Sequence, residues 1–358
     1  MRTINLILAL IFLVTIFSAC GETQRAALET DDDSYVQAQP PAQEESEKLE
    51  PLHTWVTIGG VEYSTLLTHL DLSHRRLTDY ELEPLRYMVN LTSLYLNGTR
   101  ISDLAPLAEL VNLEYLRLHR NNISDLSPLA GLVNLRELNL ASNNIIDLSA
   151  LAGLVNLREL NLGLNSISDL SPLAELVNLQ SLSLHINNIS DPSPIAGLEN
   201  LRRLSLRSNE ISDLSPLAGL TNLEFIQLSE NNISCISPLA EFASLRYLEA
   251  SHNNISDLSP LVGLESLYDI VMHHNNVSDL SPLAELENLQ VLFMHSNNIS
   301  DLSPLAGLTS LENLSLTYNN ISDISPLAEL TNLKTLGLGG NNISDWSPVD
   351  HVGRVYLD

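Results

Sequence analysis

The sequence is poor in cysteine, aromatic residues and positive charge. Its two cysteines, Cys20 and Cys235, are too few for a scaffold held by several disulfides. Only 5% of the residues are aromatic, so the core must be built mainly from leucine, isoleucine and alanine. Lysine and arginine number 17 against 44 acidic residues, and the formal net charge is -27. This charge argues against nucleic acid as a partner and favours basic or neutral partners.

Catalytic signatures are also missing. The chain has no G-x-S-x-G, no H-E-x-x-H and no phosphate-binding loop. These motifs mark common hydrolases, metalloproteases and nucleotide-binding sites. We therefore predict a protein that is not an enzyme and that needs no cofactor.

The N-terminus holds a nearly unbroken apolar run, at residues 6–17. It follows Arg2, and two small residues then lead to Cys20. This is the layout of a secretory signal, and it is too short for a comfortable membrane span. The stretch resembles a bacterial lipobox, with Phe17 where leucine is usual, which implies removal of residues 1–19 and lipidation of Cys20. An ordinary signal peptide with an incidental cysteine is the alternative.

The segment at 20–52 differs from the rest of the chain in composition. It contains three consecutive aspartates at 31–33, a Pro-Pro pair and an acidic cluster at 44–47, with few large apolar residues. Such a segment buries too little apolar surface to offset the entropy lost on ordering. We predict a lipidated cysteine followed by an acidic, disordered tether.

A repeat governs residues 67–345. The pattern L-x-x-L-x-L-x-x-N-x-I-x-D-L-x-P-L-A-x-L-x-N recurs every 22 residues from Leu113 to Leu333. Two less regular units precede it, which makes thirteen; the first runs 24 residues and has Arg75 in place of the asparagine. The L-x-L alternation predicts a short strand with its leucines on one face. Stacked units can bury that face by forming one parallel sheet.

The other fixed positions of the repeat have structural explanations. Asn121 and its ten equivalents follow each strand, where a buried amide can bond the backbone of its own and the next turn. Ser127-Pro128 predicts a helix N-cap followed by proline at the first position of a short 3-10 helix. One aspartate recurs in each unit except at Cys235. We interpret these aspartates as turn and cap residues, because one carboxylate per turn is too few for a calcium ladder.

Irregular segments flank the repeats. Trp55 to Ser64 predicts a strand-turn-strand unit around Gly59-Gly60, within an N-terminal cap at 53–66. Residues 346–358 depart from the repeat and are predicted to form a C-terminal cap. There, Trp346 would cover the last open layer of leucines.

The repeats and both caps together resemble a known family. The unit N-x-I-S-D-L-S-P-L-A-G-L-x-N-L, the cap I-G-G-V-E-Y-S-T-L-L-T-H-L-D-L-S and the terminal D-W-S-P-V-D-H-V are similar to those of bacterial internalin-like leucine-rich-repeat proteins over residues 55–358. The resemblance implies an α/β solenoid, or horseshoe, with a parallel sheet on the concave face and short 3-10 turns on the convex face. It also implies an exported, surface-displayed, protein-binding module. No LPxTG-like motif follows residue 345, so we expect the lipid on Cys20 to replace wall attachment.

The variable strand positions carry the functional information. In L-x-x-L-x-L-x-x-N, the third, fifth, seventh and eighth positions are expected to face the concave side, with neighbouring strands about 4.8 Å apart. Exposed aromatic and arginine side chains there are typical binding anchors. The predicted N-terminal cluster is Tyr95, Tyr115, Arg117, His119 and Arg120. The predicted C-terminal cluster is Phe225, Tyr247, His252, Val271, His273, His274, Phe293, His295 and Tyr318.

Histidine is concentrated at the same positions. Eight of the ten histidines occupy them, four within three consecutive repeats. Such a cluster suits zinc or copper, or pH-dependent binding, but exposed polar side chains explain it more simply, and we predict no metal site. The sequence thus predicts a membrane-anchored, extracytoplasmic monomer whose concave face binds a protein. A glycan-binding or structural envelope protein is the alternative, because concave aromatic rings can stack on sugars.

Overall fold

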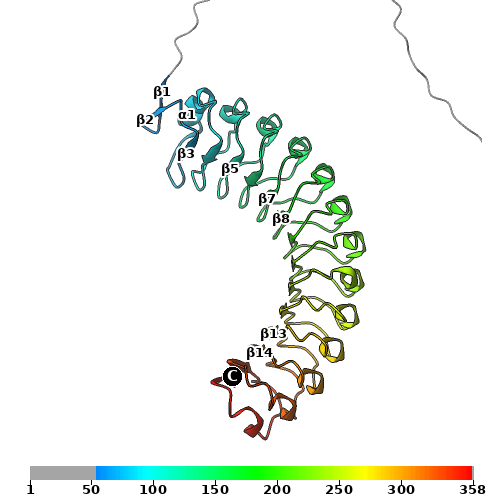
Figure 1. Cartoon of the computed structure of the whole chain (residues 1–358). Coiled ribbons are helices and arrows are strands. Elements are labelled where there is room, and N and C mark those ends of the chain that lie inside the picture. The colour runs from blue at the N-terminus through cyan, green and yellow to red at the C-terminus, as the bar shows by residue number, and fades with distance from the viewer. Residues whose placement is uncertain (1–53, 357–358) are drawn as a thin grey trace, which may run out of the picture. The chain divides into compact units, whose positions relative to one another are not determined.

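A curved stack of repeats forms the part of the chain that the structure, a computed structural model, describes: residues 54–356 (Figure 1). The predicted signal sequence, Cys20 and the tether at 20–52 lie outside these residues. Within 54–356, no helix has both the length and the apolar character needed to span a bilayer.

One parallel sheet of fourteen strands runs through the stack in chain order. Its register places residues one repeat apart side by side, as with Tyr115 and Glu137. The sequence predicts thirteen repeat strands, and β16, in the predicted C-terminal cap, adds one more beside β15. The strands are β3 (His69–Asp71), β4 (Ser93–Tyr95), β5 (Tyr115–Arg117), β6 (Glu137–Asn139), β7 (Glu159–Asn161), β8 (Ser181–Ser183), β9 (Arg203–Ser205), β10 (Phe225–Gln227), β11 (Tyr247–Glu249), β12 (Asp269–Val271), β13 (Val291–Phe293), β14 (Asn313–Ser315), β15 (Thr335–Gly337) and β16 (Arg354–Tyr356).

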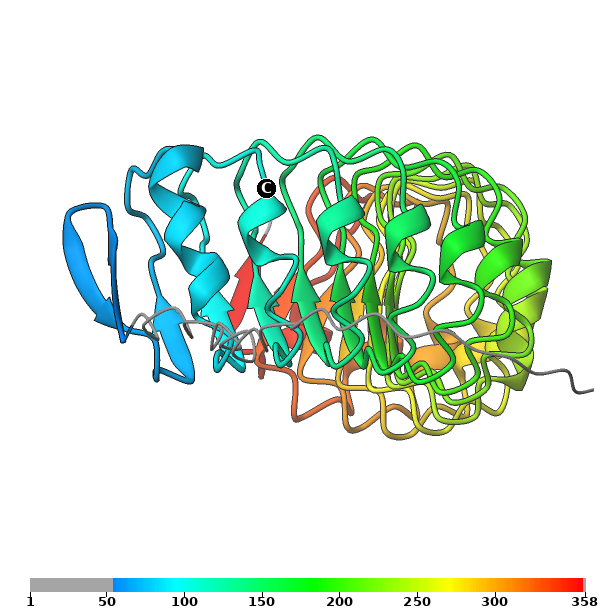
Figure 2. The ribbon, with the colours of Figure 1, turned by 90° about the horizontal axis from the view of Figure 1, so that it is seen from above.

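The return segments are short helical turns. Figures 1 and 2 show them on the outer side of the curve, with the strands on the inner side. The first repeat carries α1 (Asp79–Leu82) followed by a 3-10 helix, η1. This arrangement confirms the predicted horseshoe. The 3-10 helices are η1 (Glu83–Tyr87), η2 (Ala105–Leu107), η3 (Ser127–Leu129), η4 (Ser149–Leu151), η5 (Ser171–Leu173), η6 (Ser193–Ile195), η7 (Ser215–Leu217), η8 (Ser237–Glu241), η9 (Ser259–Leu261), η10 (Ser281–Leu283), η11 (Ser303–Leu305), η12 (Ser325–Leu327) and η13 (Ser347–Val349).

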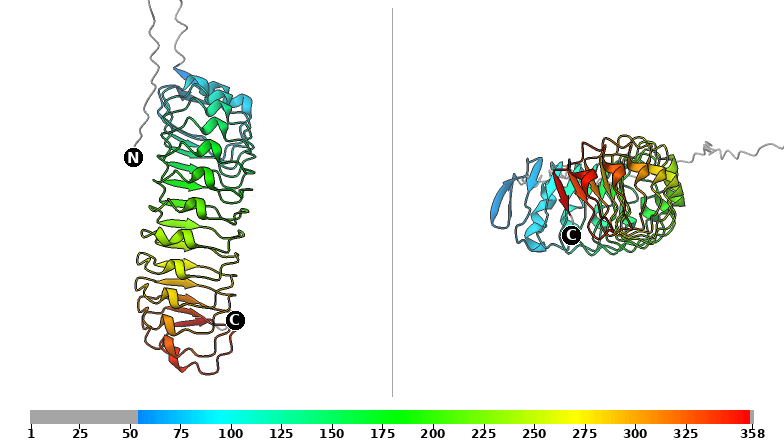
Figure 3. Two further views of the ribbon diagram at one scale, coloured as in Figure 1. Left: turned by 90° about the vertical axis from the view of Figure 1, so that its right-hand side faces the viewer. Right: turned by 90° about the horizontal axis from the view of Figure 1, so that it is seen from below.

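The core is a set of leucine columns that runs the length of the stack. Figure 3 shows the ribbon of this stack from the side. In the third repeat Leu113, Leu116 and Leu118 are all fully buried. Burying such a side chain contributes about 1.5–3 kcal/mol. Because no single unit could bury its leucines alone, each repeat depends on its neighbours, and the rigid sheet is the result.

Both ends of the leucine columns are covered. At the N-terminus β1 (Trp55–Ile58) and β2 (Val61–Ser64) form the predicted antiparallel hairpin. Its turn residues Gly59 and Gly60 have φ of 55° and 77°, a conformation that favours glycine. At the other end Trp346 packs, partly buried, against the core.

The asparagine ladder bonds in a different direction from the one predicted. The Nδ2 of Asn143 donates to the carbonyl of Leu140 in its own turn, at 2.9 Å, and to that of Leu118 in the preceding turn, at 3.1 Å. Its Oδ1 accepts the N–H of Ile123, also in the preceding turn. The prediction of a bond to the next turn is therefore wrong. The Leu118 carbonyl lies just past its strand, where the sheet ladder has ended, so the side-chain amides satisfy it instead.

The predicted serine N-caps are also wrong, by one residue. Ser127 is the first residue of η3, and the N-cap is Leu126, which makes no side-chain cap bond. Instead the carboxylate of Asp125 accepts the N–H of Ser127 at 2.8 Å and its hydroxyl at 2.9 Å. These bonds lower the pKa of Asp125. The interpretation of the aspartates as turn residues is confirmed, and they take over the capping that the sequence assigned to serine.

Candidate functional site

Strand geometry decides which variable positions face the concave side. In β10, Phe225 and Gln227 lie half-buried on that face while Ile226 between them is fully buried. The third and fifth positions of each repeat therefore form two columns along the sheet.

The eighth position behaves differently, because it lies in the turn after the strand. In all thirteen repeats its backbone is in the left-handed region, so these side chains leave the chain at the carboxyl edge of the sheet. The residues are His74, Gly98, Arg120, Ser142, Leu164, Ile186, Ser208, Glu230, His252, His274, Ser296, Tyr318 and Gly340.

Two of the five residues of the predicted N-terminal cluster, Tyr95 and Arg117, make internal contacts. The guanidinium of Arg117 lies 4.9 Å from the centroid of the Tyr95 ring and pairs with Glu137 at 2.8 Å. The pKa of His119 is lowered, mainly by burial. Tyr115 is exposed at the strand edge of this group. The charge of Arg117 is thus already neutralised within the sheet.

The predicted C-terminal cluster divides into two separate places. The first, here called the concave hollow, has a volume of about 580 Å³ and spans β8 to β12. Phe225 and Tyr247 lie in it, with their ring centroids 6.1 Å apart. Its lining residues are Ser181, Leu182, Ser183, Arg203, Leu204, Ser205, Phe225, Gln227, Tyr247, Tyr268 and Asp269.

Two charged residues extend the aromatic pair within the third column. The register places Arg203 beside Phe225 and Asp269 beside Tyr247. The guanidinium of Arg203 lies 5.0 Å from the centroid of the Phe225 ring. Neither charge, nor Tyr268, belongs to the predicted C-terminal cluster. The spacing of 22 places Arg203 and Asp269 in the same column as the aromatic pair, one repeat further on each side, but it does not show that they lack counter-ions.

Both charges of this row lack a counter-ion. Arg203 is exposed and makes no ion pair within residues 54–356, whereas the neighbouring Arg202 pairs with Glu224. The Oδ1 of Asp269 is buried without a hydrogen-bond partner. Burial, and then the nearby charge of Glu249, raise the pKa of Asp269 to about 6. A buried acceptor left unpaired is costly to the fold, and such groups concentrate at functional sites.

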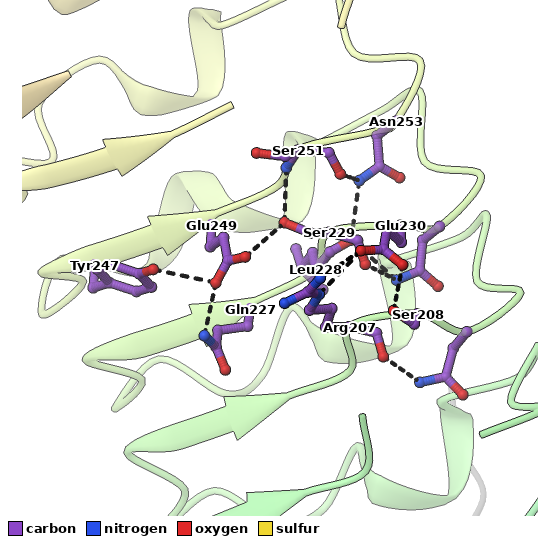
Figure 4. A network of polar contacts seen from close by, with 12 residues as sticks. Arg207, Ser208, Gln227, Leu228, Ser229, Glu230, Tyr247, Glu249, Ser251 and Asn253 are labelled. Atoms are coloured by element: carbon purple, nitrogen blue, oxygen red, sulfur yellow. Dashed lines mark hydrogen bonds and ion pairs between the residues drawn. The ribbon is translucent and has the colours of Figure 1, made fainter. Parts of the chain in front are cut away.

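Glu249 fixes the tyrosine of the hollow in place (Figure 4). Its carboxylate accepts hydrogen bonds from Gln227 Nε2 at 2.7 Å, from Ser229 Oγ at 3.1 Å and from the Tyr247 hydroxyl at 3.2 Å. Burial, together with Glu249, raises the pKa of Tyr247 to about 12. Tyr247 is thereby held as a neutral ring at the centre of the row.

The second place is a histidine patch formed by His252, His273, His274 and His295. Two pairs of rings stack face to face, with centroids 3.7 Å apart for His273 and His295 and 4.3 Å for His252 and His274. His274 meets His295 edge to face at 4.7 Å. Phe293 stacks beside His273 at 6.1 Å. Among the residues that the structure describes, no group of three potential ligands is placed to hold a metal ion. The patch is a stack of rings rather than a ring of converging nitrogens.

A ladder of side-chain acceptors leads into this patch along the seventh column. Ser229 Oγ accepts the N–H of Ser251 at 2.9 Å, and Ser251 Oγ accepts the N–H of His273 at 3.0 Å. His273 Nδ1 then accepts the N–H of His295 at 3.3 Å. His273 therefore replaces a serine hydroxyl in a structural role.

The last two predicted residues lie outside the concave hollow. Val271 is paired in register with Phe293 in the fifth column. Tyr318 is largely exposed, and its ring lies over Gly340, where a Cβ would meet it at 2.4 Å. Of the fourteen residues in the two predicted clusters, only Phe225 and Tyr247 line the hollow.

Comparison with known proteins agrees with this geometry. The family model for leucine-rich repeats in two copies matches residues 65–109, 111–153, 155–197, 199–241, 243–285, 270–307, 287–329 and 309–351. The structure of an internalin (InlF) from Listeria monocytogenes is 37% identical, with a TM-score of 0.80, and the match covers 83% of this chain and 89% of that one. The chain belongs to the internalin-like leucine-rich-repeat proteins.

More distant structures share the fold of this internalin-like protein. A leucine-rich-repeat protein of Leptospira interrogans is 22% identical with a TM-score of 0.63, over 81% of this chain and 90% of that one. The functional domain of InlJ from Listeria monocytogenes is 21% identical with a TM-score of 0.61, over 81% and 72%. No curated protein matches the chain. The family is typical of protein–protein interaction, and no catalytic family is indicated.

Proposed function

We propose that this internalin-like chain is a membrane-anchored, extracytoplasmic protein that binds a protein partner through its concave face, centred on the concave hollow. The observation that supports this is the hollow itself, where the aromatic pair Phe225 and Tyr247 stands between two charges without counter-ions. Aromatic anchors on a rigid surface are typical of binding hot spots. The fixed positions of the repeat are accounted for by stacking and turn chemistry and leave this surface free for a ligand.

The partner can be identified by comparing two variants of the full chain. Phe225→Ala with Tyr247→Ala empties the hollow, while Val133→Ala with Val155→Ala makes an equal number of truncations at exposed positions. Proteins captured from a cell-surface extract by the parent and the valine variant, but not by the hollow variant, are the candidates. With a purified candidate, the hollow variant should bind at least about tenfold more weakly, since hot-spot truncations cost about 2 kcal/mol or more. Undiminished binding by that variant contradicts the proposal.

A glycan is the competing ligand, because tyrosine and phenylalanine rings can stack on sugars. Tyr247 and Phe293, the rings first considered for that role, lie in different columns, on β11 and β13. A glycan array decides between the two ligand classes. Saturable sugar binding that Tyr247→Ala and Phe293→Ala abolish would replace the protein partner with an envelope or surface glycan.

The membrane anchor is proposed from the sequence around Cys20. A lipid on this cysteine would hold the protein at the membrane without a spanning helix. We expect the parent to sediment with membranes and Cys20→Ala to appear in the soluble exported fraction, with Cys235→Ala as the control. Membrane association that survives Cys20→Ala rules out the lipid anchor but leaves the concave-face proposal intact.

A further inference from the structure

The third column of four consecutive strands forms a row with opposite charges at its ends. Arg203 on β9, Phe225 on β10, Tyr247 on β11 and Asp269 on β12 are neighbours in register. All four line the concave hollow. Neither terminal charge has a partner to neutralise it within the described chain: Arg203 has only the face of Phe225, and Asp269 Oδ1 has no hydrogen bond.

The row has a length that an extended peptide matches. Three strand spacings of about 4.8 Å separate Arg203 from Asp269, or about 14 Å. An extended chain advances about 3.3–3.6 Å per residue, so four residues cover this distance. Side chains at i, i+2 and i+4 of such a chain point to the same side. Three side chains of one segment can therefore meet the row together.

We propose that this row binds an extended segment of the partner protein with the pattern acidic–x–apolar–x–basic, read in either chain direction. The inference rests on the proposed function and specifies its ligand. The acidic side chain pairs with the exposed guanidinium of Arg203. The apolar side chain packs on the exposed side of the Phe225 and Tyr247 rings. The basic side chain reaches Asp269.

The surroundings of each end favour that assignment of charges. At the Asp269 end, Glu249 adds negative potential, and Tyr247 and Tyr268 line the hollow with aromatic rings, which attract cations. At the Arg203 end, the rest of the lining on β8 and β9 is uncharged and brings no second charge: Ser181, Leu182, Ser183, Leu204 and Ser205. A ligand with one charge would leave the other end of the row unpaired.

A linear nonapeptide library displayed on phage, selected on the full chain, tests the pattern directly. We expect enriched sequences to carry one acidic and one basic residue four positions apart with an apolar residue midway. A synthetic peptide of the enriched sequence should bind about tenfold more weakly to Arg203→Gln and to Asp269→Asn, since each loses a hydrogen bond to a charged group. High salt should weaken the parent's binding too.

Charge reversal gives a sharper test of specificity. In Asp269→Lys both ends of the row are positive, so selection on this variant should enrich peptides with two acidic residues four positions apart. Glu265→Lys makes the same change of net charge at an exposed position of the segment between η9 and β12, and should select the same sequences as the parent. Asp269→Asn supplies an independent test if the lysine variant fails to fold, which circular dichroism reveals.

Two kinds of result overturn the inference. One is selection of no peptide at all, or of peptides without the charge pattern. The other is selection of patterned peptides whose affinity does not change in Arg203→Gln and Asp269→Asn. If those peptides still require Phe225 and Tyr247, the proposed concave-face function stands and only the charged row is wrong. If a partner is captured independently of the whole hollow, both proposals fail.

Discussion

The Nδ1 atom of His273 accepts the backbone N–H of His295 at 3.3 Å, and the two imidazole rings stack with their centroids 3.7 Å apart. A protonated ring would place a donor against that N–H. Burial, followed by the charges of His295, His274 and His252, lowers the pKa of His273 to about 4. His273 is therefore held as a neutral imidazole within the patch.

This arrangement predicts a loss of stability in acid. The folded protein keeps His273 neutral down to about pH 4, whereas the unfolded chain takes up the proton near the ordinary value of 6.5. Because the unfolded state binds more protons in this interval, stability falls as the pH drops from about 6.5 to 4. His273→Ser removes the titrating group but keeps an acceptor, as Ser251 does one repeat earlier. As the pH is lowered from 7 to 4.5, the Tm of this variant should rise relative to the Tm of the parent.

The Tm of the variant must be compared with that of the parent at the same pH, because other groups titrate over the same interval. His69→Ser, a change at an exposed histidine of the first strand, serves as the control. If the Tm difference produced by His273→Ser is the same at both pH values, the account of His273 as a neutral imidazole is wrong.

The pH dependence of stability that Asp269 contributes has the opposite sign. Its pKa is raised to about 6 in the fold from an ordinary value of 3.8, so the folded protein binds the extra proton. Stability from this group is therefore present in acid and is lost as the pH rises from about 3.8 to 6. Asp269→Asn should stabilise the chain at pH 7, by on the order of 1 kcal/mol once solvent screening of this half-buried group is allowed for. Near pH 4 the gain should nearly vanish, as thermal unfolding at the two pH values can show.

A matched aspartate should respond in the other direction. Asp257 accepts the N–H and the hydroxyl of Ser259 at 2.8 and 2.9 Å, and these bonds lower its pKa. Asp257→Asn should therefore destabilise the protein at pH 7. If Asp269→Asn also destabilises the protein, the charge of Asp269 stabilises the fold. The argument that a destabilising carboxylate is retained for binding then fails.

The 22-residue spacing was enough to predict the sheet, its register and its columns. A parallel sheet with one strand per repeat must place residue i beside i+22, as the pairing of Phe225 with Tyr247 shows. The aromatic pair of the hollow followed from that rule. The choice of Arg203 and Asp269 did not follow from it. These residues stand out because they lack a counter-ion or a hydrogen-bond partner, which depends on side-chain conformations that the spacing does not determine.

The turn after each strand was harder to predict. In a sequence, a left-handed backbone conformation is normally indicated by glycine or asparagine. Here the eighth position also holds Leu164, Ile186 and Tyr318, whose side chains give no such signal. The stack imposes the conformation, because Ile186 must donate its N–H to the carbonyl of Arg207 in the next repeat. Tertiary bonding thus overrides the preference of the residue.

The asparagine ladder allows a graded stability test. Asn253 donates to the carbonyls of Leu228 and Ala250 and accepts the N–H of Ile233. Asn253→Ala leaves these buried groups without partners and should cost roughly 2–3 kcal/mol. Asn253→Thr should cost less, because Thr99 in the second repeat bonds the equivalent carbonyl through its hydroxyl at 2.8 Å. Urea unfolding measures both, and equal losses would mean that packing, not bonding, explains the asparagine.

The left-handed turn gives the last prediction, a gain of stability at an exposed position. Ile186 has φ of 54°, where an L-residue pays about 1–2 kcal/mol and a β-branched one is a clear outlier. Asparagine tolerates this conformation, so Ile186→Asn should stabilise the chain by about 1 kcal/mol. Ile146→Asn makes the same substitution at a site that is more exposed, 65% against 44%, and whose φ is not positive. Thermal unfolding should show a gain for Ile186→Asn alone, and equal shifts in the two variants would mean that the removal of exposed apolar surface, rather than relief of backbone strain, is responsible.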